Sequence, residues 1–109
     1  MEFSKITAII RSDKVETIEK ELLRLKVPGV SISKGKGFSD NPNFLSQEWA
    51  MTHVRVEVFI GKHRADEIAI AIMNVAHSGV QGDGIVAISP VETIYHIRKK
   101  EKCQYDVCE

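Results

Sequence analysis

The chain contains few cysteines and no excess of charge of either sign. Only two of its 109 residues are cysteines, Cys103 and Cys108, and both lie in the segment 103–109. A core held together by disulfides is therefore excluded. Lys+Arg and Asp+Glu are equal at 15 each, so no overall field draws the protein to nucleic acid or to an acidic membrane.

Long apolar runs are also lacking. No stretch approaches the roughly 20 residues that a membrane-spanning helix needs. The opening residues, MEFSKITAIIRSDK, hold no long apolar segment of a secretory signal, so we expect a cytoplasmic protein. What is present is ordinary for one folded domain: hydrophobic residues make up 43% and charged residues 28%.

The spacing of the hydrophobic residues predicts four strand regions and two helices. The first helix is expected to open with a capping box at Asp13 and Glu16 and to end at Pro28–Gly29. The second covers 65–78 and is expected to stop at Gly79. The predicted strands are 4–11, 30–36, 52–60 and the residues after 84, the last of these divided at Pro90 into a strand pair or one bent strand.

This order of elements is typical of the α+β ferredoxin-like fold (βαββαβ), in which two helices cover one face of an antiparallel sheet. The other face carries apolar residues such as Phe59, so we expect other subunits of a homo-oligomer to cover it. Residues 34–51 show little periodicity and exceed the usual length of a connection, which indicates a functional loop or disorder.

Three glycines within six positions mark the segment HSGVQGDG at 77–84. Glycine loses more conformational freedom on folding than any other residue, so the cluster needs a local cause. A structural turn is one explanation. The other is a set of backbone N–H groups that converge, without hindrance from Cβ atoms, to bind an anion such as phosphate. Spacing alone favours the turn, because the segment matches neither a Walker loop nor a Rossmann turn.

The whole chain resembles the PII signalling proteins, a family of nitrogen-regulatory trimers. The resemblance lies in KITAIIR, VPGVSIS, KGF, VRVEVFI, HSGVQGDG and IYHIRKKE, and it spans about residues 3–101. It implies a ferredoxin-like PII domain over 1–102, assembled as a homotrimer. Within this domain it places a T-loop at 36–53 and a B-loop at 78–85, and a cysteine-containing tail follows at 103–109.

The resemblance also implies that adenine nucleotides bind between subunits. In the B-loop, Gly82, Asp83 and Gly84 would hold phosphate. Arg98 and His96 stand where the family places two arginines that reach phosphates from the neighbouring subunit. The positions that enclose adenine and ribose in the family are occupied here by Ile9, Gly29, Ser31, Gly37, Phe38, Glu57 and Val58.

Departures from the family pattern affect the expected ligand. Ile85 replaces the lysine after GDG, and His96 replaces an arginine, which is a stronger base than histidine. A triphosphate loses most from these changes, so we expect ADP or AMP to be preferred over ATP. Asn41 and His53 replace a glutamine and a lysine that the family uses for 2-oxoglutarate, which predicts impaired sensing of that metabolite.

The T-loop, which is shorter here than in the family, carries four bulky apolar residues, Phe44, Leu45, Trp49 and Met51. Such side chains suit either docking to a partner or packing on the subunit's own body. The resemblance favours docking, with a membrane transporter as the expected partner.

The two cysteines allow inert thiols, a redox switch or a pair of metal ligands, and a reducing cytoplasm favours inert thiols. A metal-binding or redox-responsive oligomer that uses the cysteines and histidines is the alternative function. No nucleophile–base pair and no carboxylate pair stands out, so an enzyme has little support.

Overall fold

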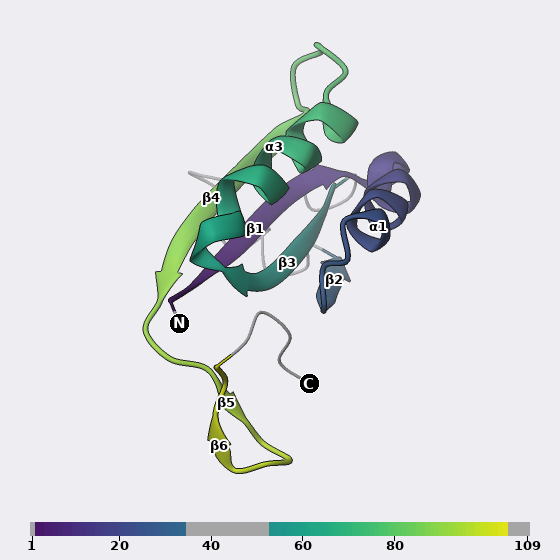
Figure 1. Ribbon diagram of the computed structural model, residues 1–109. Coiled ribbons are helices and arrows are strands. Elements are labelled where there is room, and N and C mark those ends of the chain that lie inside the picture. The colour runs from purple at the N-terminus through teal and green to yellow at the C-terminus, as the bar shows by residue number, and fades with distance from the viewer. Residues whose placement is uncertain (1, 35–52, 105–109) are drawn as a thin grey trace, which may run out of the picture.

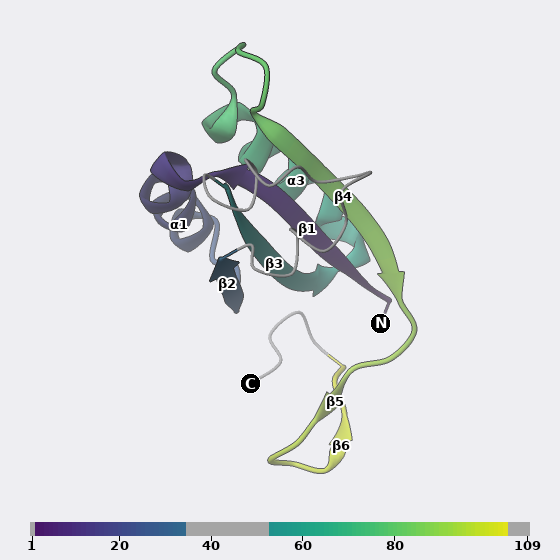
Figure 2. The same cartoon turned by 180° about the vertical axis from the view of Figure 1, so that it is seen from behind.

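The structure is a computed structural model and describes residues 2–34 and 53–104. Its main feature is a four-stranded antiparallel sheet with the strand order β2-β3-β1-β4. Both helices cover the same face of this sheet (Figures 1 and 2), which confirms the predicted ferredoxin-like fold. The elements are β1 (Phe3–Arg11), α1 (Val15–Arg24), β2 (Val30–Lys34), β3 (His53–Gly61), α3 (Ala65–Ala76) and β4 (Gly84–Val91).

The core lies between the sheet and the two helices. In the central strands β1 and β3 every second side chain points toward the helices, because side chains alternate across a strand. Burying each large aliphatic side chain contributes about 1.5–3 kcal/mol. The strand predicted at 52–60 is confirmed as β3. Its side chains Val54, Val56, Val58 and Ile60 are all buried, and they share the core with Ile18 and Leu22 of α1 and Ile68 and Ile72 of α3.

The beginning of α1 differs from the prediction. Ser12–Lys14 forms a 3-10 turn, and α1 starts at Val15 without a side-chain cap. The predicted capping box is therefore wrong. Asp13 already lies inside a helical turn, whereas an N-cap residue needs an extended backbone to bring its side chain to the first free N–H groups.

The end of α1 also comes earlier than Pro28–Gly29. Lys26 has a left-handed φ of 58°, and its N–H donates to the carbonyl of Leu23 at 3.0 Å. The N–H of Val27 donates to the carbonyl of Leu22 at 3.0 Å. These two hydrogen bonds form a Schellman motif in which lysine takes the position usually held by glycine. The motif ends the helix at Arg24 and brings Val27 into the core.

The second helix, α3, ends at Ala76, and His77 is already extended with φ −65° and ψ 127°. Gly79 is therefore not the residue that stops the helix. The cause lies in the following loop and is described below. Neither helix in the described part of the chain has the length and apolar character that a membrane crossing requires.

The C-terminal region differs most from the prediction. Pro90 lies inside β4, opposite Ser4 of β1, and does not break the strand. Because β4 is at the edge of the sheet, a residue without an N–H is tolerated there. The chain leaves the sheet after Val91 and forms a separate hairpin of β5 (Tyr95–His96) and β6 (Glu101–Lys102), which projects away from the body (Figure 1).

Candidate functional site

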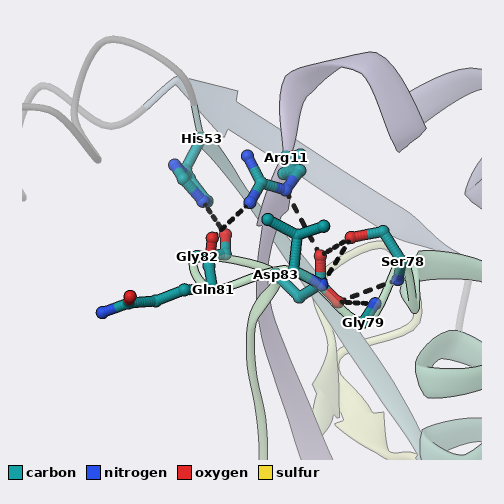
Figure 3. A network of polar contacts seen from close by, with 8 residues as sticks. Arg11, His53, Ser78, Gly79, Gln81, Gly82 and Asp83 are labelled. Carbon is teal, nitrogen blue, oxygen red and sulfur yellow. Dashed lines mark hydrogen bonds and ion pairs between the residues drawn. The ribbon is translucent and has the colours of Figure 1, made fainter.

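The loop 77–83 joins α3 to β4 and is organised around the carboxylate of Asp83 (Figure 3). This carboxylate accepts hydrogen bonds from the backbone N–H groups of Ser78 (2.8 Å) and Gly79 (2.9 Å) and from the Ser78 hydroxyl. Arg11, at the end of β1, adds an ion pair of 3.3 Å between Nε and Oδ1. Two amides that a longer helix would direct at its own carbonyls bind Asp83 instead, which explains the early end of α3.

The same contacts keep Asp83 ionised. The hydroxyl of Ser78 makes the largest contribution, and the N–H groups of Ser78 and Gly79 and the guanidinium of Arg11 add to it. Together they hold the pKa of the Asp83 carboxyl well below its usual range, although burial acts in the opposite direction. A carboxylate that accepts several hydrogen bonds in this way carries its charge at any physiological pH.

Two further side chains hold backbone carbonyls of the loop. Nη2 of Arg11 donates to the carbonyl oxygen of Gln81 at 2.6 Å, and the ring Nε2 of His53 lies 2.6 Å from the carbonyl oxygen of Gly82. A carbonyl only accepts, so His53 carries a proton on Nε2. Arg11 and His53 face each other in the register of β1 and β3. The ends of the two central strands therefore support the loop together.

All three glycines of the loop region adopt positive φ angles: 84° at Gly79, 96° at Gly82 and 107° at Gly84. Other residues rarely adopt this conformation. The loop also packs closely on its supports. A Cβ atom on Gly84 would lie 1.8 Å from the carbonyl oxygen of Ile9, and one on Gly82 would lie 3.0 Å from Nη2 of Arg11. Backbone geometry alone thus accounts for the glycines, with or without a ligand.

A pocket of about 720 Å³ lies between β2, β3 and the C-terminal hairpin. Its walls are mainly apolar and include Phe3, Phe59 and Ile97. The acidic group in it, Glu57, forms ion pairs with Lys5 and with Arg55, the latter at 3.2 Å. Apolar walls with a few placed polar groups are typical of small-molecule sites. Five residues of the predicted nucleotide set line this pocket: Gly29, Ser31, Glu57, His96 and Arg98.

A second pocket, of about 220 Å³, lies where α3 and the loop meet β1 and β4. Three more residues of the predicted set line it, namely Ile9, Asp83 and Gly84, and Ile85 lies beside them. The two pockets have no lining residue in common.

The remaining predicted residues fall into two groups. Val58 is on β3 but its side chain is buried in the core beneath the helices, and Gly82 is in the loop beside Arg11. The others lie outside the described residues: Gly37 and Phe38 of the nucleotide set, and Phe44, Leu45, Trp49 and Met51 of the partner set.

Comparison with known proteins identifies the family. The family model described as Nitrogen regulatory protein P-II matches residues 3–101. The chain belongs to the P-II family. This result confirms the resemblance seen in the sequence.

Individual P-II proteins match over most of their length. The nitrogen regulatory protein P-II of Cyanidium caldarium is 28% identical over 107 residues, which cover 92% of this chain and 95% of that protein. The nitrogen regulatory protein GlnK2 of Haloferax mediterranei is 31% identical over 100 residues, covering 85% and 81%. The crystal structure of Arabidopsis thaliana PII bound to citrate matches with a TM-score of 0.77 and 25% identity, covering 94% of this chain and 90% of that one.

In this P-II chain the predicted nucleotide residues of the glycine loop and those of the C-terminal hairpin are far apart. The loop 77–83 lies at one end of the molecule and the β5–β6 hairpin at the other (Figure 1). His96 is in β5 and Arg98 follows it, so both residues lie at the hairpin end. One chain by itself therefore does not bring Arg98 to the glycine loop.

Within 2–34 and 53–104, no three His, Cys, Asp or Glu side chains gather in a way that could hold a metal ion. Cys103 is buried and disulfide-bonded, which contradicts the expectation of inert thiols at this residue. Its backbone N–H donates to the carbonyl of Ile94 at 2.8 Å. Cys108 lies outside the described residues.

Sequence reasoning missed Arg11, Ser78 and Gln81 as parts of the loop network. Arg11 follows Ile9 at a spacing of two residues, which indicates that both lie on one face of β1. That signal was present in the sequence. Which loop meets this face is decided by the pairing of β1 with β4, and local sequence patterns do not record that pairing.

Proposed function

We propose that this P-II protein is a regulator that binds adenine nucleotides between the subunits of a homotrimer. The observation that supports this most directly is the gathering of five predicted residues around the 720 Å³ pocket. Its apolar walls suit a purine base, and the carboxylate of Glu57 suits the hydroxyls of ribose. The guanidinium of Arg98 suits a phosphate group.

The proposed position between subunits follows from the separation of the glycine loop and the C-terminal hairpin within one chain. A site that uses both the glycine loop and Arg98 needs the hairpin of one subunit to reach the loop of another. Such head-to-tail contacts close into a ring when the rotation between subunits permits. The exposed apolar residues of the sheet face opposite the helices support such contacts, because Phe59 there is 50% exposed.

The proposed ligand is ADP or AMP in preference to ATP. Ile85, beside Asp83 and Gly84, brings no positive charge to the pocket next to the loop. Arg11, a cation at the same loop, is already bound to Asp83 and to the carbonyl of Gln81. A third phosphate group therefore meets few positive partners, and each charge-assisted contact is worth about 1.5–3 kcal/mol.

The regulated partner is proposed to be a membrane transporter that the protein contacts from the cytoplasm through residues 36–53, without catalysing a reaction. The apolar side chains Phe44, Leu45, Trp49 and Met51 suit a contact of this kind. His53, the last residue of the range, contacts the carbonyl of Gly82, which joins the end of the range to the glycine loop. A nucleotide that interacts differently with two states of this range shifts their populations.

Isothermal titration calorimetry with AMP, ADP and ATP tests the proposal, together with light scattering to measure the mass of the assembly. We expect one nucleotide per subunit, tighter binding of ADP or AMP than of ATP, and a mass of three chains. Arg98→Met should weaken binding of ADP, whereas Arg24→Met, on the exposed side of α1, should not. Failure of all three nucleotides to bind at millimolar concentration rejects the function, and a monomeric mass rejects the site between subunits.

A further inference from the structure

The contacts that hold the carbonyls of Gln81 and Gly82 determine where the N–H groups of the following residues, Gly82 and Asp83, point. The carbonyl of Gln81 and the N–H of Gly82 belong to one peptide bond, and the carbonyl of Gly82 and the N–H of Asp83 belong to the next. The described chain contains no cis peptide bond. In a planar trans peptide the carbonyl and the N–H point in opposite directions.

Arg11 and His53 hold these two carbonyls on the side of β1 and β3, each with a contact of 2.6 Å (Figure 3). The N–H groups of Gly82 and Asp83 are therefore turned to the opposite side of the loop. Successive N–H groups that face one side form a concavity that favours anions. Gly82 permits this arrangement, because a Cβ at this position would lie 3.0 Å from the guanidinium of Arg11.

We propose that Arg11 and His53 are positioning residues that aim the N–H groups of Gly82 and Asp83 at a phosphate group of the ligand. This inference rests on the proposed function and adds the side chains that orient its phosphate site. Neither residue needs to touch the ligand. Each acts through a backbone carbonyl, so its effect is confined to the phosphate end of a nucleotide.

Asp83 strengthens the arrangement by binding amides in the first part of the loop. Its carboxylate accepts the N–H groups of Ser78 and Gly79, and the Ser78 hydroxyl accepts the N–H of Val80 at 3.3 Å. The N–H groups of Ser78 and Gly79 are thus occupied by the carboxylate of Asp83 and not by a ligand. The ion pair of Asp83 with Arg11 also fixes the guanidinium that holds the carbonyl of Gln81.

Four variants and two ligands separate this role from a general loss of structure. Arg11→Met and His53→Leu remove the donors but keep most of the bulk, and His53→Gln keeps a side-chain N–H donor. His63→Leu, at an exposed histidine in the turn before α3, is the matched control. Binding of ADP and of adenosine is measured for each. Backbone amide shifts are recorded by NMR for wild type, Arg11→Met and His53→Leu during titration with ADP and with inorganic pyrophosphate.

We expect the amides of Gly82 and Asp83 to shift most in the wild-type protein with either phosphate ligand. Arg11→Met and His53→Leu should each weaken ADP binding about 10-fold, as expected for the loss of one orienting contact, and should leave adenosine binding unchanged. His53→Gln should recover most of the affinity for ADP. His63→Leu should match the wild type.

The outcomes distinguish this inference from the proposed function. If the wild type binds ADP but the shifts lie at other amides, or the two variants bind ADP normally, the positioning role is rejected and the function stands. An equal loss of adenosine and ADP binding also rejects the role. If no adenine nucleotide binds but pyrophosphate shifts the two amides only in the wild type, the role stands and the function fails. No shift with either ligand rejects both.

Discussion

Gly84 packs directly against the backbone of Ile9: a Cβ atom on Gly84 would lie 1.8 Å from the Ile9 carbonyl oxygen. The φ of Gly84 is 107°, which a residue with a side chain rarely adopts. Gly84→Ala therefore forces β4 away from β1 in addition to straining its own backbone. We expect the free energy of unfolding to fall by about 3 kcal/mol or more, measured by urea denaturation.

Gly29→Ala is the control for this prediction. A Cβ on Gly29 would meet no atom within 4 Å, so its effect on stability should stay within about 0.5 kcal/mol. Equal losses in the two variants would contradict the explanation by close packing. The comparison also bears on ligand studies, because weak nucleotide binding by Gly84→Ala can result from unfolding alone.

Acid should reduce the stability of the loop through Asp83. The pKa of Asp83 is lowered in the folded protein, chiefly by the Ser78 hydroxyl. Its contribution to the free energy of unfolding is therefore fully present above the unfolded pKa of about 3.9, and it is lost as the pH falls below that value. The free energy of unfolding should therefore fall less between about pH 7 and about pH 3 in Asp83→Asn than in the wild type. Denaturation at the two pH values measures this difference. Glu92→Gln, at an exposed carboxyl, should behave like the wild type.

Replacing Lys26 with glycine should stabilise the protein. Lys26 holds a left-handed φ of 58° in the Schellman motif that ends α1, and this conformation is unfavourable for a residue with a Cβ. Glycine removes that strain but gains freedom in the unfolded chain, so we expect a net gain of about 0.5–1 kcal/mol. Thermal or urea denaturation measures it. The same change at Lys20, inside α1, should cost about 1 kcal/mol, and a loss at both positions would refute the role given to the motif.

Sequence patterns predicted the fold well because its main determinants are local. The alternation along β3 and the helical spacing in α1 and α3 follow from which side chains enter the core, and the structure confirms both. The ends of the helices depend on individual hydrogen bonds of the capping residues, such as those of Lys26 and Val27, and hydrophobic spacing does not record these bonds. The Asp83 carboxylate accepts the N–H groups of Ser78 and Gly79. The helix α3 therefore ends before Gly79, which the sequence pattern predicted as its stop.

The candidate site, like the fold, was predicted only in part from local sequence patterns. Residues of the predicted nucleotide set cluster around two pockets, yet their roles were inferred from a family resemblance and not from spacing. The support for the loop comes from Arg11 and His53, which lie far apart in the sequence and face each other only through strand pairing. No local pattern predicts that a charged residue at the end of a strand will hold the carbonyl of Gln81.

The hairpin offers a direct test of assembly that does not depend on any ligand. Ile97, between β5 and β6, is 93% exposed, and Leu23 on α1 is 75% exposed. If the hairpin of one subunit packs on another, Ile97→Asp places a charge in an apolar contact, which is costly to bury. Leu23→Asp adds the same charge on the outer face of a helix. We expect light scattering at micromolar concentration to show monomers for Ile97→Asp and trimers for Leu23→Asp, with both folded by circular dichroism. A trimeric Ile97→Asp protein would mean that the hairpin does not carry the assembly, and the joining of Arg98 to a neighbouring glycine loop would lose its support.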